Sequence, residues 1–308
     1  MKILIYGTGG VGGYFGGRLA QAGGDVTFIA RGEHLKAMHA NGLKILSPKG
    51  DFTITHPQAT DNVSGLGAMD LIILGVKSWQ VKEAARSVKD LIKPETVILP
   101  LQNGVFANEE IMAVIGKSNL VGGLCKIISR IEGPGIINHM MYEPSIAMGE
   151  LGNQGSARIE KLQSLFQQAG ISTTIASDID AALWKKFMFI CTGGLGALTR
   201  SSYGVNREMP GTRKLLQELI SEIYTLARHL GIALKEEDKE KTMNIVDSLP
   251  YHATSSMQRD LMEGRPSELE YLTGAVVKLA ENQGVEAPVN SFIYHCLLPI
   301  ESQNRVKQ

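Results

Sequence analysis

The sequence predicts an α/β protein, with an N-terminal Rossmann-type, doubly wound sheet and a C-terminal all-helical domain. In the first half, short apolar runs alternate with amphipathic stretches, which predicts βαβ units around a parallel sheet. A glycine-rich segment directly follows the first apolar run. From about residue 178 onward no segment has a strand pattern, and helical spacing prevails. We therefore expect two domains, over residues 1–178 and 179–308.

Four short runs rich in leucine or β-branched residues are expected to form buried strands of the parallel sheet. They are Ile3–Tyr6, Val26–Ala30, Leu71–Val76 and Val97–Leu99. The stretches 11–22, 33–41 and 79–92, which lie between them, have helical character. Residues 43–55 predict a hairpin with a Ser-Pro-Lys-Gly turn.

The remaining elements are expected in two groups. Before residue 178 the sequence predicts strands over Leu120–Ile128, Gly135–Met141, Ser145–Gly149 and Ile171–Ile175, and a helix over 156–169. Beyond it, helical spacing covers Ile179–Leu198, Thr212–His229, Lys235–Ser248, Glu268–Gln283 and Ser291–Gln303. Gly231 occupies the expected C-terminal cap of the second of these helices.

Composition argues against several classes of function. Lysine and arginine total 31, aspartate and glutamate also total 31, so bulk charge does not favour a nucleic-acid partner. The most apolar stretch, residues 71–76, is far too short to span a membrane, and no secretory signal precedes the first glycines. Three widely spaced cysteines make no disulfide framework, which favours a cytoplasmic location. The seven histidines form no metal-binding motif, so we expect no metal.

The glycine-rich segment has the context of a dinucleotide-binding fingerprint, because it follows a strand and opens a helix. Its residues are Gly7, Thr8, Gly9, Gly10, Val11 and Gly12, and we expect all six to bind a cofactor. Gly7 would permit the tight turn, Gly9 would let the backbone approach the pyrophosphate, and Gly12 would allow close helix–strand packing. A glycine-rich turn without a ligand is the alternative.

Arg31 indicates which dinucleotide is bound. It directly follows the second predicted strand, where an NAD enzyme usually has a carboxylate for the ribose 2′-hydroxyl. A guanidinium can instead form paired bonds to a 2′-phosphate. The sequence therefore favours NADP(H), although an exposed loop arginine is the simpler alternative.

Four later segments carry the motifs of one enzyme family. They are GVKSWQV at 75–81, LPLQNGV at 99–105, LWKKF at 183–187 and SSMQRDLMEGRPSELEYLTG at 255–274. Together with the glycine loop they resemble the ketopantoate reductase (2-dehydropantoate 2-reductase) family over nearly the whole chain. The resemblance implies an NADP-binding domain over 1–178, a helical substrate and dimerisation domain over 179–308, and NADPH-dependent reduction of a 2-oxo acid to pantoate for pantothenate and coenzyme A synthesis.

The resemblance also implies roles for five residues. Lys186 would be the general acid, donating a proton to the developing alkoxide. Glu268, the second catalytic residue, would pair with Lys186 or hold a ribose hydroxyl. Lys77 and Asn103 would contact both cofactor and substrate, and both follow strand-like runs, where ligands of doubly wound sheets bind. Ser256 would bond the substrate carboxylate, and Lys77, Asn103, Lys186, Ser256 and Glu268 together would form the substrate site.

Three of these assignments have a plainer alternative. Lys186 could be a solvated lysine like Lys185. Asn103-Gly104 could be only a turn dipeptide. Glu268 could be a carboxylate stabilised by a helix N-terminus, since Pro266-Ser267-Glu268 has the pattern of a helix start.

The sequence departs from the family pattern after Lys186. The family usually carries asparagines four and eight residues later, on one helical face, whereas this chain has Ile190 and Gly194. A site that lacks such groups loses specificity for a substrate hydroxyl. The chain could therefore be a paralogue that reduces another 2-oxo acid or ketone, or a catalytically silent NADP-binding regulator. A helical second domain often supports pairing of two copies, so a homodimer is also an expectation.

Overall fold

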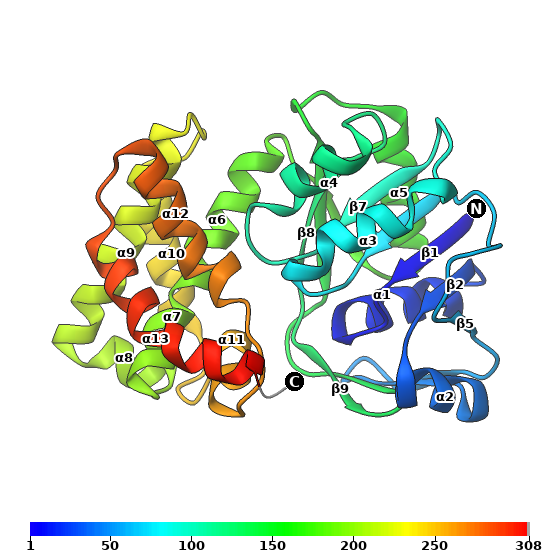
Figure 1. The fold of residues 1–308 in the computed structure, drawn as a ribbon, viewed down its shortest axis with the longest axis horizontal. Helices are drawn as coiled ribbons and strands as arrows, with labels where there is room; N and C mark the ends of the chain where they lie inside the picture. The colour runs from blue at the N-terminus through cyan, green and yellow to red at the C-terminus, as the bar shows by residue number, and fades with distance from the viewer. Residues whose placement is uncertain (307–308) are drawn as a thin grey trace. The chain divides into compact units, whose positions relative to one another are not determined.

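The computed structural model describes residues 1–306 and divides the chain into two compact units. The first unit comprises Met1–Gln102 and Phe106–Ile179, drawn from blue to green in Figure 1. The second comprises Asn103–Val105 and the described residues from Asp180 onward. The short segment Asn103–Val105 therefore belongs, by its contacts, with residues far along the chain.

The first unit is built on a parallel sheet of five strands. They are β1 (Lys2–Tyr6), β2 (Asp25–Ile29), β5 (Gln58–Thr60), β6 (Leu71–Leu74) and β7 (Val97–Pro100), in the order β5-β2-β1-β6-β7. The chain moves outward from β1 in both directions, which makes the carboxyl end of β1 the topological switch point where such sheets bind ligands. The predicted α/β, doubly wound class is confirmed.

Helices cover both faces of this sheet, which explains the continuous apolar runs of its strands. On β1, Ile3 and Ile5 pack in one buried cluster with α1 (Gly10–Gln21) and α5 (Ala157–Gln168). Leu4 and Tyr6 face the opposite cluster, with α3 (Val81–Ser87) and α4 (Ala107–Ile115). The predicted helix 79–92 is divided into the 3-10 turn η1 (Ser78–Gln80), α3 and the 3-10 turn η2 (Lys89–Leu91).

Two smaller sheets complete the unit. A three-stranded sheet has the order β12 (Ser172–Ile175), β11 (Ser145–Glu150), β8 (Val121–Lys126), and a parallel bridge between Ile98 and Leu120 joins its edge to β7. The other has the order β4 (Phe52–Ile54), β3 (Leu43–Leu46), β10 (Ile136–His139), β9 (Ser129–Gly133). Its β3 and β4 are antiparallel, as the hairpin prediction requires, and Gly50 adopts φ +105° in the turn. Helix α2 (Gly32–Asn41) follows β2.

The second unit consists of helices and the loops that join them, with no strand among its described residues. Its helices are α6 (Ile179–Cys191), α7 (Gly193–Thr199), α8 (Tyr203–Glu208), α9 (Pro210–His229), α10 (Glu237–Ser248), α11 (Ser256–Met262), the 3-10 turn η3 (Leu269–Tyr271), α12 (Thr273–Gln283) and α13 (Pro288–Val306). Gly231 ends α9 as predicted, with φ +79° and an amide that donates to Arg228. Among the described residues, no helix is both long and apolar enough to cross a membrane.

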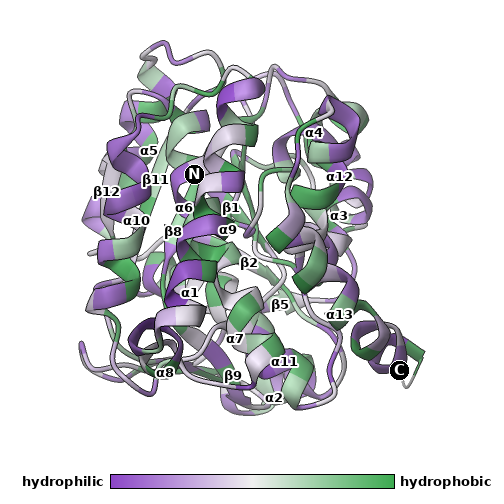
Figure 2. Ribbon diagram, turned by 90° about the vertical axis from the view of Figure 1, so that its left-hand side faces the viewer, coloured by the Kyte–Doolittle hydropathy of each residue, from purple (hydrophilic) through white to green (hydrophobic). Residues whose placement is uncertain are grey.

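The helices of this unit show the amphipathic pattern that the sequence predicted. In α10, Thr242, Met243 and Val246 are buried, while Glu240 and Lys241 on the other side are exposed. Figure 2 shows the same alternation as hydrophobic and hydrophilic segments around α10. The short helices α8 and α11 escaped prediction, because six and seven residues are too few to establish a period.

Two helices predicted as continuous are broken. The prediction for Ile179–Leu198 fails at Thr192, whose amide donates to the Phe189 carbonyl three residues back, at 3.2 Å, in place of a bond four residues back. The Thr192 hydroxyl donates to the same carbonyl at 2.5 Å. The prediction for Glu268–Gln283 fails at Leu272, where φ −112° and ψ −96° lie outside the helical region.

Candidate active site

The glycine loop has the shape needed to bind a dinucleotide at the end of β1. Gly7 adopts φ +100°, which only glycine tolerates readily, and a Cβ at Gly12 would collide with the Gly7 carbonyl oxygen. Gly9 differs, because its φ of −82° and ψ of −163° suit any residue and a Cβ there would meet no protein atom within 4 Å. The protein itself does not require glycine at position 9, and no side chain caps α1. Both features fit a pyrophosphate at this helix N-terminus.

The other residues of the loop hold its shape. Thr8 donates both its amide and its hydroxyl to the Ile29 carbonyl, at 3.0 and 2.8 Å. Gly10 lies against β9, since a Cβ would collide with the Ser129 carbonyl oxygen. Val11 is half-buried and packs on the apolar core. Direct contact of Thr8, Gly10 and Val11 with a cofactor stays a prediction.

The loops after β2 and β6 both lie beside the glycine loop. Thr8 ties the loop to Ile29, two residues before Arg31. On the other side the Gly75 amide donates to the Tyr6 carbonyl at 2.9 Å, and a Cβ at Gly75 would lie 2.9 Å from the Gly12 Cα. Arg31 and Lys77 follow strands, as the sequence predicted, and the strand order shows that both strands flank β1.

Arg31 is the residue predicted to bind a 2′-phosphate. It precedes α2, its side chain is 61% exposed, and its guanidinium lies 3.9 Å from the Glu83 carboxylate. Lys36, in the first turns of the same helix, pairs with Glu33 at 2.7 Å. His34 accepts a hydrogen bond from the Gly135 amide, and burial lowers its pKa, so the neutral imidazole is favoured there.

Lys77 lies at the start of the turn that leads into α3. Its amide donates to the Gln80 side chain at 3.3 Å, and its ammonium lies 5.8 Å from the centre of the Trp79 ring. That distance allows a cation–π attraction. Lys77 is half-buried and remains the basic residue at the carboxyl end of β6.

Gln102 is a positioning residue that the sequence analysis missed. Its buried amide donates to the carbonyls of Leu74 and Val76, at 2.8 and 3.1 Å. It therefore fixes the end of β6 to the segment after β7, directly before Asn103. The one indication in the sequence was the place of Gln102 in the LPLQNGV segment. Its hydrogen-bond partners lie 28 and 26 residues away, so the sequence did not reveal them.

In the helical unit the structure brings Asn103 and Glu268 together. The Asn103 amide donates to the Glu268 carboxylate at 3.2 Å. Gly104 adopts φ +95°, and a Cβ there would lie 2.8 Å from the Tyr271 carbonyl oxygen. Asn103-Gly104 is thus a turn and also a contact with the segment around Glu268. That carboxylate precedes a 3-10 turn of three residues, so it does not occupy the first turn of α12.

Lys186 lies on α6 and is half-buried. Its neighbour Lys185 has a structural partner instead, because its ammonium lies 3.2 Å from the buried Asp238 carboxylate. Ile190 follows Lys186 by one turn of α6, on the same face, and is also half-buried. Ser256 is the exposed first residue of α11.

Gly194 belongs to the next helix, α7. It follows the break at Thr192, and a Cβ there would lie 3.0 Å from both the Thr273 hydroxyl and the Ile293 side chain. Glycine at this position serves close packing inside the helical unit. That Lys186, Ile190 and Gly194 face one substrate stays a prediction.

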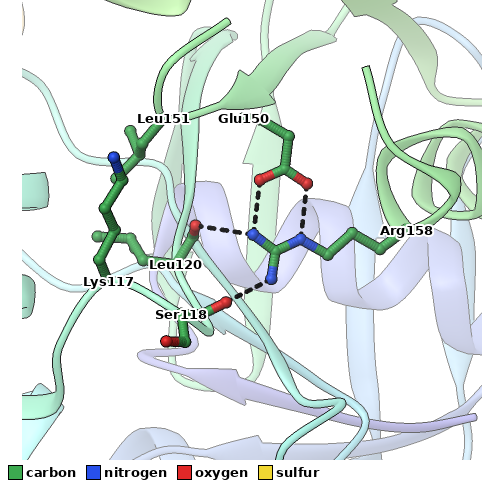
Figure 3. A pocket seen from close by; sticks show the side chains of 6 residues that line it. All are labelled: Lys117, Ser118, Leu120, Glu150, Leu151 and Arg158. Atoms are coloured by element: carbon green, nitrogen blue, oxygen red, sulfur yellow. Dashed lines mark hydrogen bonds and ion pairs between the residues drawn. The ribbon is translucent and has the colours of Figure 1, made fainter. Parts of the chain in front are cut away.

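A cavity of about 290 Å³ lies elsewhere in the first unit (Figure 3). Arg158 crosses it and donates to both Glu150 oxygens, at 2.6 and 2.5 Å, and to the Ser118 and Leu120 carbonyls, at 2.6 and 3.4 Å. Leu120 precedes β8, which runs parallel to β7. The cavity therefore lies at the amino ends of these strands, whereas the glycine loop lies at the carboxyl end of β1. Of the cavity's charged lining residues, Glu150 and Arg158 are engaged with each other. Over residues 1–306, no three histidine, cysteine or acidic residues cluster to hold a metal.

Comparison with known proteins identifies relatives over the full length of the chain. An oxidoreductase named YkpB from Bacillus subtilis is 32% identical over 304 residues, covering 98% of this chain and 100% of the relative. A 2-dehydropantoate 2-reductase from Nostoc is 30% identical over 314 residues, covering 100% and 97% of the two chains. The crystal structure of a 2-dehydropantoate 2-reductase from Geobacter metallireducens superposes with a TM-score of 0.90 at 28% identity, covering 97% of this chain and 99% of that one.

Two family models agree with these relatives. The model "Ketopantoate reductase PanE/ApbA" matches residues 3–153, and "Ketopantoate reductase PanE/ApbA C terminal" matches residues 178–301. Together they span most of both compact units. The chain therefore belongs to the ketopantoate reductase family of NADP-dependent oxidoreductases.

Proposed function

We propose that this enzyme reduces a 2-oxo acid with NADPH, and that the acid is ketopantoate, the precursor of pantoate in pantothenate and coenzyme A synthesis. The family match over both units is the observation that carries the proposal. The glycine loop supports the cofactor, since an uncapped helix begins beside Gly9, where no protein atom requires a glycine. Gly7, Gly9, Gly12, Arg31 and Lys77 would hold the dinucleotide.

The bound nicotinamide supplies a hydride to the carbonyl carbon. Lys186 donates a proton from its ammonium to the carbonyl oxygen, so that the ketone becomes a hydroxyl and the lysine becomes neutral until solvent protonates it again. Before the transfer its positive charge stabilises the negative charge that develops on that oxygen. The neighbour Lys185, paired with Asp238, is not available for this role.

The remaining polar residues of the helical unit would orient the reactants. The Asn103 amide, bonded to Glu268, fixes one carboxylate oxygen. The other can accept a hydrogen bond from a ribose hydroxyl or from Lys186. Ser256 offers an exposed hydroxyl to the substrate carboxylate. A bond from this hydroxyl would align the acid with the nicotinamide without taking part in proton transfer.

Ile190 favours a second candidate, a different 2-oxo acid. Its side chain lies one helical turn beyond Lys186 and cannot hydrogen-bond a substrate hydroxyl. Sites that hydrogen-bond a hydroxyl can reject the analogue without it by about 10⁴-fold or more. A chain with isoleucine at this position is expected to discriminate less.

Steady-state oxidation of NADPH tests both candidates. The key pair is ketopantoate and trimethylpyruvate, which is ketopantoate without its terminal hydroxyl, within a panel of other 2-oxo acids. Ketopantoate as the best substrate by kcat/KM supports the proposal. Equal or faster turnover of trimethylpyruvate would favour the second candidate, and Ile190→Asn should then shift the ratio towards ketopantoate. Binding of NADPH without turnover of any acid would contradict both and indicate a regulator.

A further inference from the structure

The carboxylate of Glu83 lies beside Arg31, the residue assigned to the 2′-phosphate of the cofactor. Its Oε1 is 3.9 Å from a terminal nitrogen of Arg31, and the two side chains are 68% and 61% exposed. Arg31 follows β2, whereas Glu83 belongs to the first turn of α3, after β6. These strands flank β1, and the loops that follow them both lie beside the glycine loop.

The pair of Arg31 and Glu83 contributes little to the stability of the fold. Ion pairs between exposed side chains contribute little, because water and salt screen them. A carboxylate in the first turn of a helix interacts favourably with the helix dipole, but this requires no partner. The pair also joins two segments that strand pairing and the bonds of Thr8 and Gly75 already hold in place.

We propose that Glu83 determines cofactor preference, by competing with the 2′-phosphate of NADPH for Arg31. This inference rests on the proposed function, in which Arg31 binds that phosphate. A carboxylate near Arg31 repels the phosphate and neutralises part of the charge that attracts it. The same carboxylate can accept a hydrogen bond from the 2′-hydroxyl of NADH, as acidic residues do in NAD-dependent enzymes.

The chain thus combines an arginine suited to NADP(H) with a carboxylate suited to NAD(H), supplied by two different loops. The position that usually carries the NAD-selecting acid, at the end of the second strand, is Arg31 here. Glu83 restores an acid to the same region from the opposite side of β1. The enzyme therefore binds both cofactors, with a preference for NADPH that is smaller than Arg31 alone would give.

Isothermal titration calorimetry of the full chain with NADPH and with NADH tests the proposal. Glu83→Gln keeps the shape of the side chain and removes its charge. We expect NADPH to bind about three- to tenfold more tightly to this variant than to the wild type, and NADH to bind no better. The gain in NADPH affinity should shrink at high ionic strength. Glu218→Gln is the control, because Glu218 forms an equally simple pair with Lys214 at 3.6 Å on α9 and its loss changes the net charge equally. It should alter neither affinity.

Arg31→Gln separates the inference from the assumption on which it depends. A selective loss of NADPH affinity in this variant supports the role of Arg31. If Glu83→Gln then leaves the NADPH-to-NADH affinity ratio unchanged, or lowers it, the role of Glu83 is wrong while that of Arg31 stands. If Arg31→Gln spares NADPH binding, the 2′-phosphate lies elsewhere and the inference falls with its premise.

Discussion

Gly9 and Gly12 are the same residue type with different physical requirements. At Gly12 a side chain would collide with the backbone of Gly7, so the glycine is needed by the folded protein. At Gly9 neither the backbone angles nor a neighbouring atom excludes a side chain. The fingerprint in the sequence predicts both glycines, but only the structure separates the one that maintains the fold from the one left for a ligand.

Alanine at each position gives a matched prediction. Gly12→Ala should lower the free energy of unfolding by about 2 kcal/mol or more, because it overpacks the contact between α1 and the loop. Gly9→Ala should leave the melting temperature nearly unchanged and weaken NADPH binding by about tenfold or more, since its methyl group projects towards the pyrophosphate. Thermal unfolding and calorimetry measure the two effects. A Gly9→Ala protein with unaltered NADPH affinity would show that the pyrophosphate lies elsewhere.

Single residues were predictable where a local motif defines them. The role of Arg31 could be predicted because its position relative to the second strand is fixed by short-range spacing. Glu83 and Gln102 were not, because their significance depends on which loops converge at the carboxyl end of the sheet. The pairing of Asn103 with Glu268 spans 165 residues, and no spacing within either motif reveals it.

At the scale of elements, periodicity predicted where helices occur better than where they end. The apolar spacing continues through Thr192, so one helix was expected where two lie. The break depends on a side-chain bond to the backbone and on tight packing of Gly193 against Ser255, neither of which changes the hydrophobic pattern.

The Glu150–Arg158 pair joins three elements and gives a prediction about stability. Arg158 on α5 bonds the end of β11 and the segment before β8 (Figure 3). Side-chain exposure is only 13% for Glu150 and 33% for Arg158. Arg158→Met should therefore lower the free energy of unfolding at neutral pH by about 1–3 kcal/mol, because it removes the charged partner of a largely buried carboxylate and leaves it only the Ser156 hydroxyl, at 2.5 Å. Chemical denaturation measures the loss.

The pH dependence of that loss checks its electrostatic origin. Hydrogen bonds from Arg158 hold the pKa of the Glu150 carboxyl below its usual value. A lowered pKa stabilises the folded state above the unfolded-state pKa, and this stabilisation disappears as pH falls through the folded-state pKa. The difference between wild type and Arg158→Met should shrink in acid. The exposed pair of Arg130 and Glu132 provides the control, since Arg130→Met should leave the melting temperature unchanged. A difference that is independent of pH would indicate lost packing instead.

At the scale of the molecule, the sequence separates an α/β half from a helical half because their hydrophobic periods differ. The segment Asn103–Val105 was not separable in this way, because its assignment depends on contacts with Glu268 and Tyr271. The zero net charge, which argued against nucleic acid, says nothing about the reaction. The proposed chemistry depends on a few charges in local positions, with Lys186 foremost.

Replacement of Lys186 tests the account most directly. Single-turnover and steady-state rates are measured for Lys186→Ala with the best 2-oxo acid, and the NADPH dissociation constant is measured on the same preparation. The account predicts that kcat falls by about 10²–10⁴-fold, because no group then protonates the carbonyl oxygen, while NADPH affinity changes less than about twofold. Lys186→Arg, which keeps the charge but cannot readily release a proton, should also be slow. Turnover by Lys186→Ala at the wild-type rate would contradict the assignment of Lys186 as the proton donor.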